Sequence, residues 1–187
     1  MLIESFLDYL RLERNYSERT IVSYRTDLRE FGGFLENTEA ELDWKKVHAD
    51  HVRNWMVSLM EGGKAATSVN RKLSSLRSFY RFLLRKKLVA VNPMLKIVGP
   101  KKKKPLPFFV REKDMNRLLD EIPFKEGFEG CRDRTILEMF YATGMRLSEL
   151  IALNDADVDF ASKLIKVTGK RNKQRLIPFG KELEEDL

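Results

Sequence analysis

Apolar residues recur at intervals of three and four along the first half of the chain, the period of an amphipathic helix. Four such stretches are separated by short polar or glycine-containing segments: Leu2 to Arg14, Ser17 to Glu36, Asp50 to Met60 and Thr67 to Lys87. We expect Ser17 and Asp50 to cap the second and third helices. Four helices joined by short loops predict a small all-α domain.

The helical pattern stops near Lys87, and a segment rich in proline and lysine follows. Residues 90–106 include three prolines and the run Lys101-Lys102-Lys103-Lys104-Pro105. Proline fixes the backbone and like charges repel, so this segment predicts a stiff, solvated linker with almost nothing to bury. The predicted organisation is a helical domain at 1–89, a linker at 90–106 and a second domain at 107–187.

The second domain has a mixed pattern. It predicts helices near 114–121 and 131–142, a further helix after Arg146, a β-hairpin from the runs at 164–167 and 176–178, and an acidic helix from Lys181. The expected fold class is therefore mainly α, with a four-helix N-terminal domain and an α+β region that contains a hairpin.

Composition narrows the classes of function. The 187-residue chain is 43% hydrophobic and 34% charged, as in soluble proteins with a core. No apolar run approaches the ~20 residues that cross a bilayer, and the N-terminus lacks the basic start of a signal peptide. With one cysteine, Cys131, and two histidines, we expect neither a disulfide nor a metal site. We expect a cytoplasmic protein with Cys131 in its core.

Positive charge is concentrated in one part of the chain. The 50 positions between Glu61 and Glu112 hold no acid and fourteen lysines or arginines, although the signs are usually mixed on a surface. Cations neutralise phosphates, and serines let a helix approach a groove. The face of the fourth helix opposite Leu73 combines both residue types: Arg71, Ser74, Ser75, Arg77, Ser78, Arg81 and Arg85.

This basic span predicts a nucleic-acid partner. Arg71 and Arg77 are our candidates for major-groove contacts. The alternative is a solvated helix face with a basic tail, whereas a membrane surface would compete with the core for the apolar face. The full predicted DNA-binding set is Arg71, Lys72, Ser75, Arg77, Arg81, Lys101, Lys102, Lys103 and Lys104.

One junction in the second domain carries candidate chemistry. An apolar helical run stops at Gly144, which can adopt the left-handed conformation that ends a helix, and another run begins at Leu147. Arg146 is then fixed between two buried helices, beside a helix N-terminus, where a guanidinium and backbone N–H groups can hold an anion. The alternative is that Arg146 only pairs with Glu149, one helical turn on.

A second candidate is Lys170, at the tip of the predicted hairpin. Several cations follow it closely, and neighbouring cations make a lysine a readier proton donor. The alternative is an ordinary basic β-turn. The acids Asp133, Glu138, Asp155, Asp157 and Asp159 show no paired arrangement, and we expect Asp157 and Asp159 to cap or turn the chain before the hairpin.

Taken together, these features resemble a tyrosine recombinase of the phage-integrase family, and most resemble its Xer-type site-specific recombinases. The matching stretches, in family order, are SERTIVSYRTDLREFGGFL, SVNRKLSSLRSFYRFLLRKKLVAVNP, LEMFYATGMRLSELIAL and VTGKRNKQRLIP. The resemblance implies a SAM-like core-binding domain and a catalytic domain that clamp double-stranded DNA with recombination half-sites. It also implies that full-length relatives assemble as tetramers on DNA.

The resemblance further implies roles for single residues. Arg146 matches the first catalytic arginine, which holds the scissile phosphate, and Glu149 matches the acid that supports this region. Lys170 matches the hairpin lysine that protonates the departing 5′ oxygen. In the family a tyrosine attacks the phosphate and forms a phosphotyrosyl link, so no metal, ATP or other cofactor is implied.

The chain departs from the family pattern after the hairpin. It contains no His-x-x-Arg, and its tyrosines all precede Arg146, in helices that we interpret as structural: Tyr9, Tyr16, Tyr24, Tyr80 and Tyr141. We therefore expect a truncated recombinase that binds DNA and cannot cleave it. Two alternatives remain: a naturally short protein that occupies recombination sites or pairs with a full-length recombinase, and a helical adaptor for an acidic protein.

Overall fold

The structure is a computed structural model that describes residues 2–38, 43–102, 106, 108–169 and 172–187. It divides into two compact units, Met1–Pro105 (unit 1) and Leu106–Leu187 (unit 2), and each is described by itself. Among the described residues, none of the helices combines the length and the apolar character that a membrane span requires.

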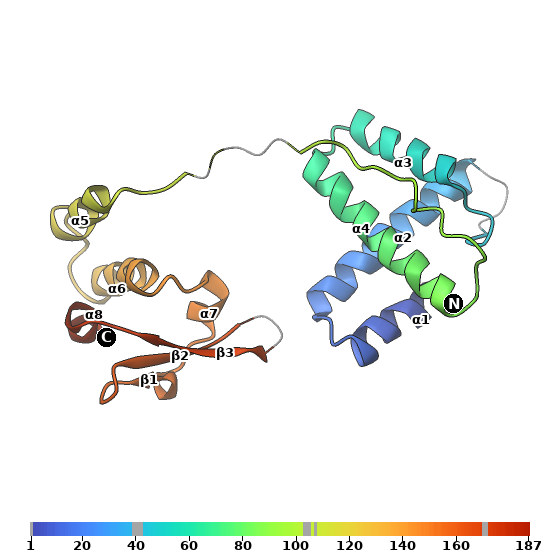
Figure 1. The fold of residues 1–187 in the computed structure, drawn as a ribbon. Helices are drawn as coiled ribbons and strands as arrows, with labels where there is room; N and C mark the ends of the chain where they lie inside the picture. The colour runs from blue at the N-terminus through green and yellow to red at the C-terminus, as the bar shows by residue number, and fades with distance from the viewer. Residues whose placement is uncertain (1, 39–42, 103–105, 107, 170–171) are drawn as a thin grey trace. The chain divides into compact units, whose positions relative to one another are not determined.

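Unit 1 is a helical bundle that contains the four predicted helices (Figure 1). The first is α1 (Leu2–Asp8), which continues directly into a wider π-helical turn, η1 (Tyr9–Glu13). The others are α2 (Glu18–Thr38), α3 (Ala49–Glu61) and α4 (Ala66–Arg85). The helical periodicity of the sequence thus predicts this unit to within a few residues at each boundary.

The N-terminus of α3 differs from the prediction. The cap residue is His48 and not Asp50, and the His48 backbone N–H donates to Nδ1 of His51 at 2.9 Å. Asp50 lies inside the first turn and pairs with Arg53. A carboxylate in the first turn still interacts favourably with the helix dipole, so Asp50 supports the helix from a different position.

The core of unit 1 is aromatic around α4. The Phe79 ring makes edge contacts with Phe6 and Trp44, with centroid distances of 5.3 and 5.0 Å. Tyr80 is fully buried, and its hydroxyl donates to the Trp44 carbonyl oxygen at 3.2 Å. Burial raises the pKa of the Tyr80 phenol above its ordinary value. These contacts fix α4 against α1 and the segment before α3.

The segment after α4 is less solvated than predicted. Met94 and Ile97 are buried in the core of unit 1. Two side chains of α4 also form hydrogen bonds with the backbone of this segment. Asn70 Nδ2 donates to the Pro100 carbonyl oxygen at 2.8 Å, and Arg77 Nη2 donates to the Ile97 carbonyl oxygen at 2.9 Å. The prediction that this segment buries almost nothing is therefore wrong up to Pro100, because isolated apolar residues in turns leave no periodic pattern.

Unit 2 combines helices with a small antiparallel sheet (Figure 1). Its helical elements are α5 (Glu112–Asp120), α6 (Phe128–Thr143), α7 (Leu147–Ile151), the 3-10 turn η2 (Asp155–Asp157) and α8 (Lys181–Asp186). The strands β1 (Val158–Asp159), β2 (Leu164–Thr168) and β3 (Gln174–Pro178) lie in the order β1-β2-β3. The hairpin β2–β3 confirms the prediction, whereas β1 is too short to recognise in the sequence.

The core of unit 2 lies on one face of the sheet. Ile165 and Val167 of β2 are buried and alternate with exposed residues, as a strand with one covered face requires. Side chains of α6 and α8 and of their flanking turns complete this cluster: Met139, Met145, Phe179 and Leu183.

Asp157 and Asp159 turn the chain before β2, as predicted. Asp157 Oδ2 accepts the Asn154 backbone N–H at 3.2 Å, and Asp159 Oδ1 accepts that of Ser162 at 3.0 Å. Asp157 also pairs with Lys166 of β2 at 2.9 Å. Both carboxylates therefore serve local turn geometry.

Candidate functional site

Glu149 is a charged side chain buried at the junction between α6 and α7. Its side chain is only 1% exposed. The junction forms because α6 ends at Gly144, whose φ of 59° is the left-handed conformation expected there. The chain then turns into α7, where Glu149 Oε2 accepts the Arg146 backbone N–H at 2.8 Å. The turn thus places Arg146 and Glu149 together at the start of α7.

Two arginines from different elements bind the Glu149 carboxylate. Arg146 Nη1 donates to Oε1 at 2.8 Å. Arg175 of β3 donates through Nη1 to Oε1 at 2.7 Å and through Nη2 to Oε2 at 2.8 Å. This second pair is bidentate, the geometry in which guanidinium and carboxylate match best. Hydrogen bonds from Arg175, and then from Arg146, lower the pKa of Glu149 from 4.5 to about 2, so the carboxylate is ionised at neutral pH.

The hairpin turn comes close to this carboxylate at Gly169. A Cβ at position 169 would lie 3.0 Å from Glu149 Oε1, so a larger residue would press on the carboxylate. The Gly169 N–H donates to the Lys173 carbonyl oxygen at 2.7 Å and closes the turn. Lys170, the next residue, lies outside the described residues, and its role as proton donor stays a prediction.

Arg146 is anchored and still accessible. Its side chain is 70% exposed, compared with 40% for Arg175. Only Nη1 binds Glu149, and the other guanidinium N–H groups have no partner among the described residues. The ion pair that was the alternative interpretation is therefore present, but it uses only part of the guanidinium. The remaining donors can bind an anion such as a phosphate.

The helix after Arg146 is shorter and more exposed than predicted. It has five residues, and Leu147 and Ile151 are 63% and 76% exposed. The prediction of an arginine fixed between two buried helices is therefore wrong for α7. Burial depends on a packing partner, which a local apolar pattern cannot reveal. The Glu149 carboxylate, and not a long helix with a strong dipole, holds Arg146 in place.

In unit 1, acids of α2 neutralise part of the basic span. Asp27 is fully buried and accepts hydrogen bonds from Arg71 Nη1 at 2.6 Å, Arg71 Nη2 at 2.8 Å and the Ser75 hydroxyl at 2.6 Å. Lys72 binds both Asp27 and Glu30. Lys72 and Ser75 belong to the predicted DNA-binding set, but they are 7% and 0% exposed, so this part of the prediction is wrong. Their partners lie 42 to 48 positions away in the sequence, beyond the reach of a local charge pattern.

The two candidates for major-groove contacts, Arg71 and Arg77, also form hydrogen bonds within unit 1. Arg71 is half-exposed, but both of its Nη atoms bind Asp27, so its two-pronged edge is occupied. Arg77 donates one Nη to the Ile97 carbonyl oxygen. The edge by which arginine reads guanine is therefore occupied in Arg71, whereas Arg77 uses only one of its Nη atoms.

Other cations of the basic span stay available. Arg81, Lys101 and Lys102 are exposed, and none of them forms an ion pair with a residue that the structure describes. Lys103 and Lys104 lie outside the described residues, and the predictions for them stand as predictions. The candidate DNA-binding set thus contracts to Arg81 and the lysine run, with Arg71 and Arg77 as anchored neighbours.

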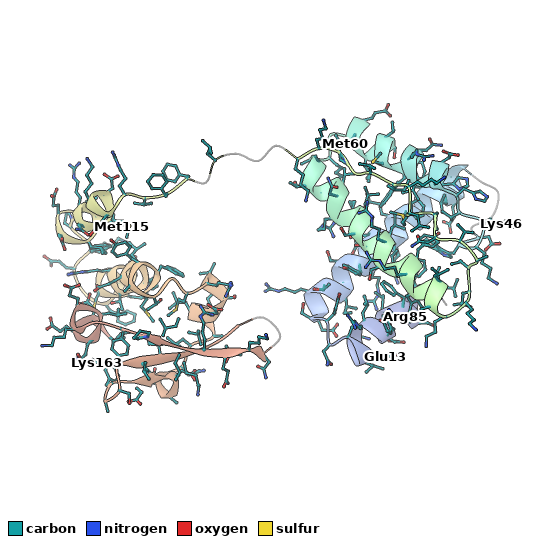
Figure 2. All side chains as sticks on the ribbon, viewed as in Figure 1. Glu13, Lys46, Met60, Arg85, Met115 and Lys163 are labelled. Atoms are coloured by element: carbon teal, nitrogen blue, oxygen red, sulfur yellow. The ribbon has the colours of Figure 1, made fainter. Side chains whose placement is uncertain are left out.

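A further cation orders the end of α4. Arg85, labelled in Figure 2, lies with its guanidinium carbon 5.6 Å from the centroid of the Tyr9 ring and donates to the Tyr9 hydroxyl. A cation over an aromatic face is attracted by the ring quadrupole. The basic face of α4 is thus held at Arg71 by α2 and at Arg85 by η1.

Sequence reasoning missed Arg175 as a site residue. Its strand position contained the signal: Arg175 pairs with the buried Val167 and lies two positions before Ile177, which places both on the core face of the sheet. A cation on a core face needs an acidic partner nearby. Glu149, in the preceding helix, is that partner.

Two side chains of α6 have surroundings that the sequence did not predict. Cys131, expected in the core, is exposed. Glu138 is 8% exposed, and burial followed by the neighbouring Asp186 raises its pKa to about 7. The acids of unit 2 thus include a close pair that forms only when α8 packs on α6.

The sequence matches two family models. The model described as "Phage integrase, N-terminal SAM-like domain" matches residues 3–87, and the one described as "Phage integrase family" matches residues 109–187. Each match covers most of one unit.

Curated relatives show the same relationship. Tyrosine recombinase XerC of Staphylococcus carnosus (strain TM300) is 42% identical over 184 residues, which are 98% of this chain and 61% of that protein. Tyrosine recombinase XerC of Pediococcus pentosaceus is 42% identical over 186 residues, which are 100% of this chain and 62% of that protein. The chain therefore spans about three fifths of the length of these curated relatives.

Solved structures resemble the fold. An integrase of the Tn1549 transposon in complex with transposon right end DNA has a TM-score of 0.76 at 16% identity and covers 99% of this chain and 63% of that one. A λ integrase dimer bound to a COC′ core site has a TM-score of 0.70 at 15% identity, with coverages of 100% and 66%. At these identities the likeness shows the fold alone.

Proposed function

The chain belongs to the phage integrase family of tyrosine recombinases, and we propose that it is the DNA-binding portion of a site-specific recombinase. It binds duplex DNA with recombination half-sites in the cytoplasm, holds one DNA phosphate at Arg146 and does not cleave the strand. The observation that carries this proposal is the state of Arg146, whose guanidinium is 70% exposed while the buried Glu149 anchors it.

The site has the charge that a phosphate requires. Two guanidinium groups and one ionised carboxylate leave one net positive charge beside the free donors of Arg146. A planar guanidinium can donate two parallel hydrogen bonds to two phosphate oxygens. Because Glu149 takes only Nη1 of Arg146, such a pair of bonds remains possible without breaking the anchor.

Unit 1 supplies the sequence-independent part of the affinity in this proposal. Exposed cations release counterions when they neutralise phosphates, and the acid-free span offers Arg81, Lys101 and Lys102 for this purpose. The solved DNA complexes of the Tn1549 and λ integrases support DNA as the partner. XerC relatives are recombinases, which supports recombination sites as the class of DNA.

The proposed absence of cleavage concerns the nucleophile within these 187 residues. The resemblance implies a tyrosine that follows the His-x-x-Arg motif, and this sequence contains no such motif. Tyr80 is buried with its hydroxyl bonded to Trp44. Tyr141 is 47% exposed, which corrects its interpretation as purely structural, but it precedes Arg146 in α6. If none of the tyrosines among these 187 residues attacks the phosphate, Lys170 has no departing oxygen to protonate, and we expect cleavage by this stretch to be abolished rather than slowed.

DNA binding is tested by a gel-shift titration of the 187-residue chain with a two-half-site duplex at several salt concentrations. We expect affinity to fall steeply between about 50 and 200 mM salt, because phosphate contacts dominate. Absent or salt-insensitive binding would contradict the proposed function.

The absence of cleavage is tested with a nicked suicide duplex, on which a recombinase leaves a covalent protein–DNA adduct. We expect no adduct on a denaturing gel. An adduct would contradict the proposal, and its loss in Tyr141→Phe would identify the exposed tyrosine as the nucleophile.

A further inference from the structure

Arg175 connects the hairpin to the residue that anchors Arg146. We propose that Arg175 is a positioning residue: by holding both oxygens of Glu149, it fixes β3 against α7 and keeps the outer edge of Arg146 free for a DNA phosphate. This inference rests on the proposed function, in which Arg146 binds that phosphate.

The hydrogen bonds of Glu149 show how Arg175 acts. Each carboxylate oxygen accepts one bond from Arg175 and one from Arg146: Oε1 from the two Nη1 atoms, and Oε2 from Arg175 Nη2 and the Arg146 backbone. The carboxylate is therefore saturated with donors, and Arg146 uses a single Nη to hold it. Without Arg175, two acceptor positions fall vacant.

Vacant acceptor positions have a direct consequence for Arg146. Glu149 is 1% exposed, so water cannot readily replace the two lost donors. Among the described residues, the other side chain that donates to Glu149 is Arg146, and the stable arrangement of one carboxylate with one guanidinium is bidentate. Glu149 would then occupy the edge of Arg146 that a phosphate needs.

The position of Arg175 suits this role better than a phosphate contact of its own. It lies on the core-facing side of β3, beside Gly169, whose missing side chain leaves room for the carboxylate. Both of its Nη atoms are committed to Glu149. A lysine at 175 would keep the charge but lack the two-pronged geometry.

The inference is tested in the 187-residue chain with Arg175→Lys, Arg146→Ala and the double variant, and with Arg132→Lys as a matched exposed control. Duplex affinity is measured by fluorescence anisotropy at one salt concentration. We expect Arg146→Ala and Arg175→Lys each to lose on the order of tenfold in affinity, the double variant to lose no more, and Arg132→Lys to bind as wild type. A further loss in the double variant would show that Arg175 acts independently of Arg146 and would overturn the inference.

A readout without DNA separates positioning from general destabilisation. The Glu149 carboxyl is titrated by carbon-detected NMR, and the hairpin resonances report the fold. In Arg175→Lys we expect the pKa of Glu149 to rise from about 2 toward 4.5 while the hairpin stays folded. If Arg175→Lys does not fold, Arg175→Gln is used with the same expectations. An unchanged Glu149 pKa would overturn the inference.

Different results would contradict the phosphate contact of Arg146 and the positioning role of Arg175. A wild-type chain that does not bind duplex, or an Arg146→Ala variant that binds as wild type, contradicts the proposed function and with it the inference. A weakened Arg146→Ala beside a neutral Arg175→Lys overturns the inference alone.

Discussion

In each unit, one buried carboxylate holds two basic side chains in place. Asp27 binds Arg71 and Lys72 in unit 1, and Glu149 binds Arg146 and Arg175 in unit 2. Both acids are almost unexposed, so lost donors are not replaced by water. A single substitution at either acid therefore disturbs several cations together.

Glu149 makes the stability of unit 2 dependent on pH. Its pKa is lowered from 4.5 to about 2 in the folded chain, chiefly by Arg175, so folding favours the ionised form. The stabilisation is fully present above about pH 4.5 and is lost as the pH falls toward 2. In thermal unfolding followed by circular dichroism, we expect the melting temperature of wild type to fall in this window. Glu149→Gln should show a shallower fall.

The control for this experiment is Glu185→Gln, which removes an exposed acid of α8. It should keep the wild-type pH profile. Parallel profiles of Glu149→Gln and wild type would contradict the anchoring role of the carboxylate.

Among the elements, the apolar periodicity of the sequence predicted correctly those helices whose apolar face is buried in the core. Val69, Leu73 and Leu76 recur on one face of α4, and all are fully buried. Leu147 and Ile151 follow a similar spacing in α7 and are exposed, because burial there depends on a partner surface far along the sequence. Arg175 and Asp27 were missed for the same reason: their significance comes from contacts between elements.

Asp27 of α2 binds Arg71 and Lys72 of α4. Asp27→Asn leaves both cations without their buried counter-charge. We therefore expect this change to destabilise unit 1 by about 3–5 kcal/mol. Urea denaturation measures the loss. Asp50→Asn, at an acid whose side chain is 81% exposed, should stay within about 0.5 kcal/mol of wild type. Equal stabilities of the two variants would show that the network contributes nothing.

Gly99 lets the segment after α4 lie against that helix. A Cβ there would meet Asn70 Oδ1 at 2.1 Å, so Gly99→Ala must displace the segment or the Asn70 side chain that holds it. We expect faster tryptic cleavage after Lys101 and Lys102, because a protease needs a detached backbone. Gly33→Ala, in the interior of α2 with nothing within 4 Å of the added Cβ, should not accelerate cleavage. Equal rates in both variants would exclude the clash.

At the scale of the whole molecule, the sequence predicted where positive charge collects more reliably than which of the cations stay exposed. The acid-free span from 62 to 111 identified where positive charge collects. It did not show that α2 supplies Asp27 and Glu30 against this span, so some of the predicted contacts are internal. Likewise, the family pattern identified Arg146, whereas the structure added the carboxylate and the second arginine that anchor it.

The most direct test of the central claim is the salt dependence of duplex binding by wild type and Arg146→Ala. If Arg146 holds one phosphate, its loss weakens binding and reduces the slope of log K against log salt by about 1. Arg117→Ala removes an equally charged residue that pairs with Glu121 on the exposed side of α5 and should keep the wild-type slope. Identical slopes and affinities for wild type and Arg146→Ala would contradict the account.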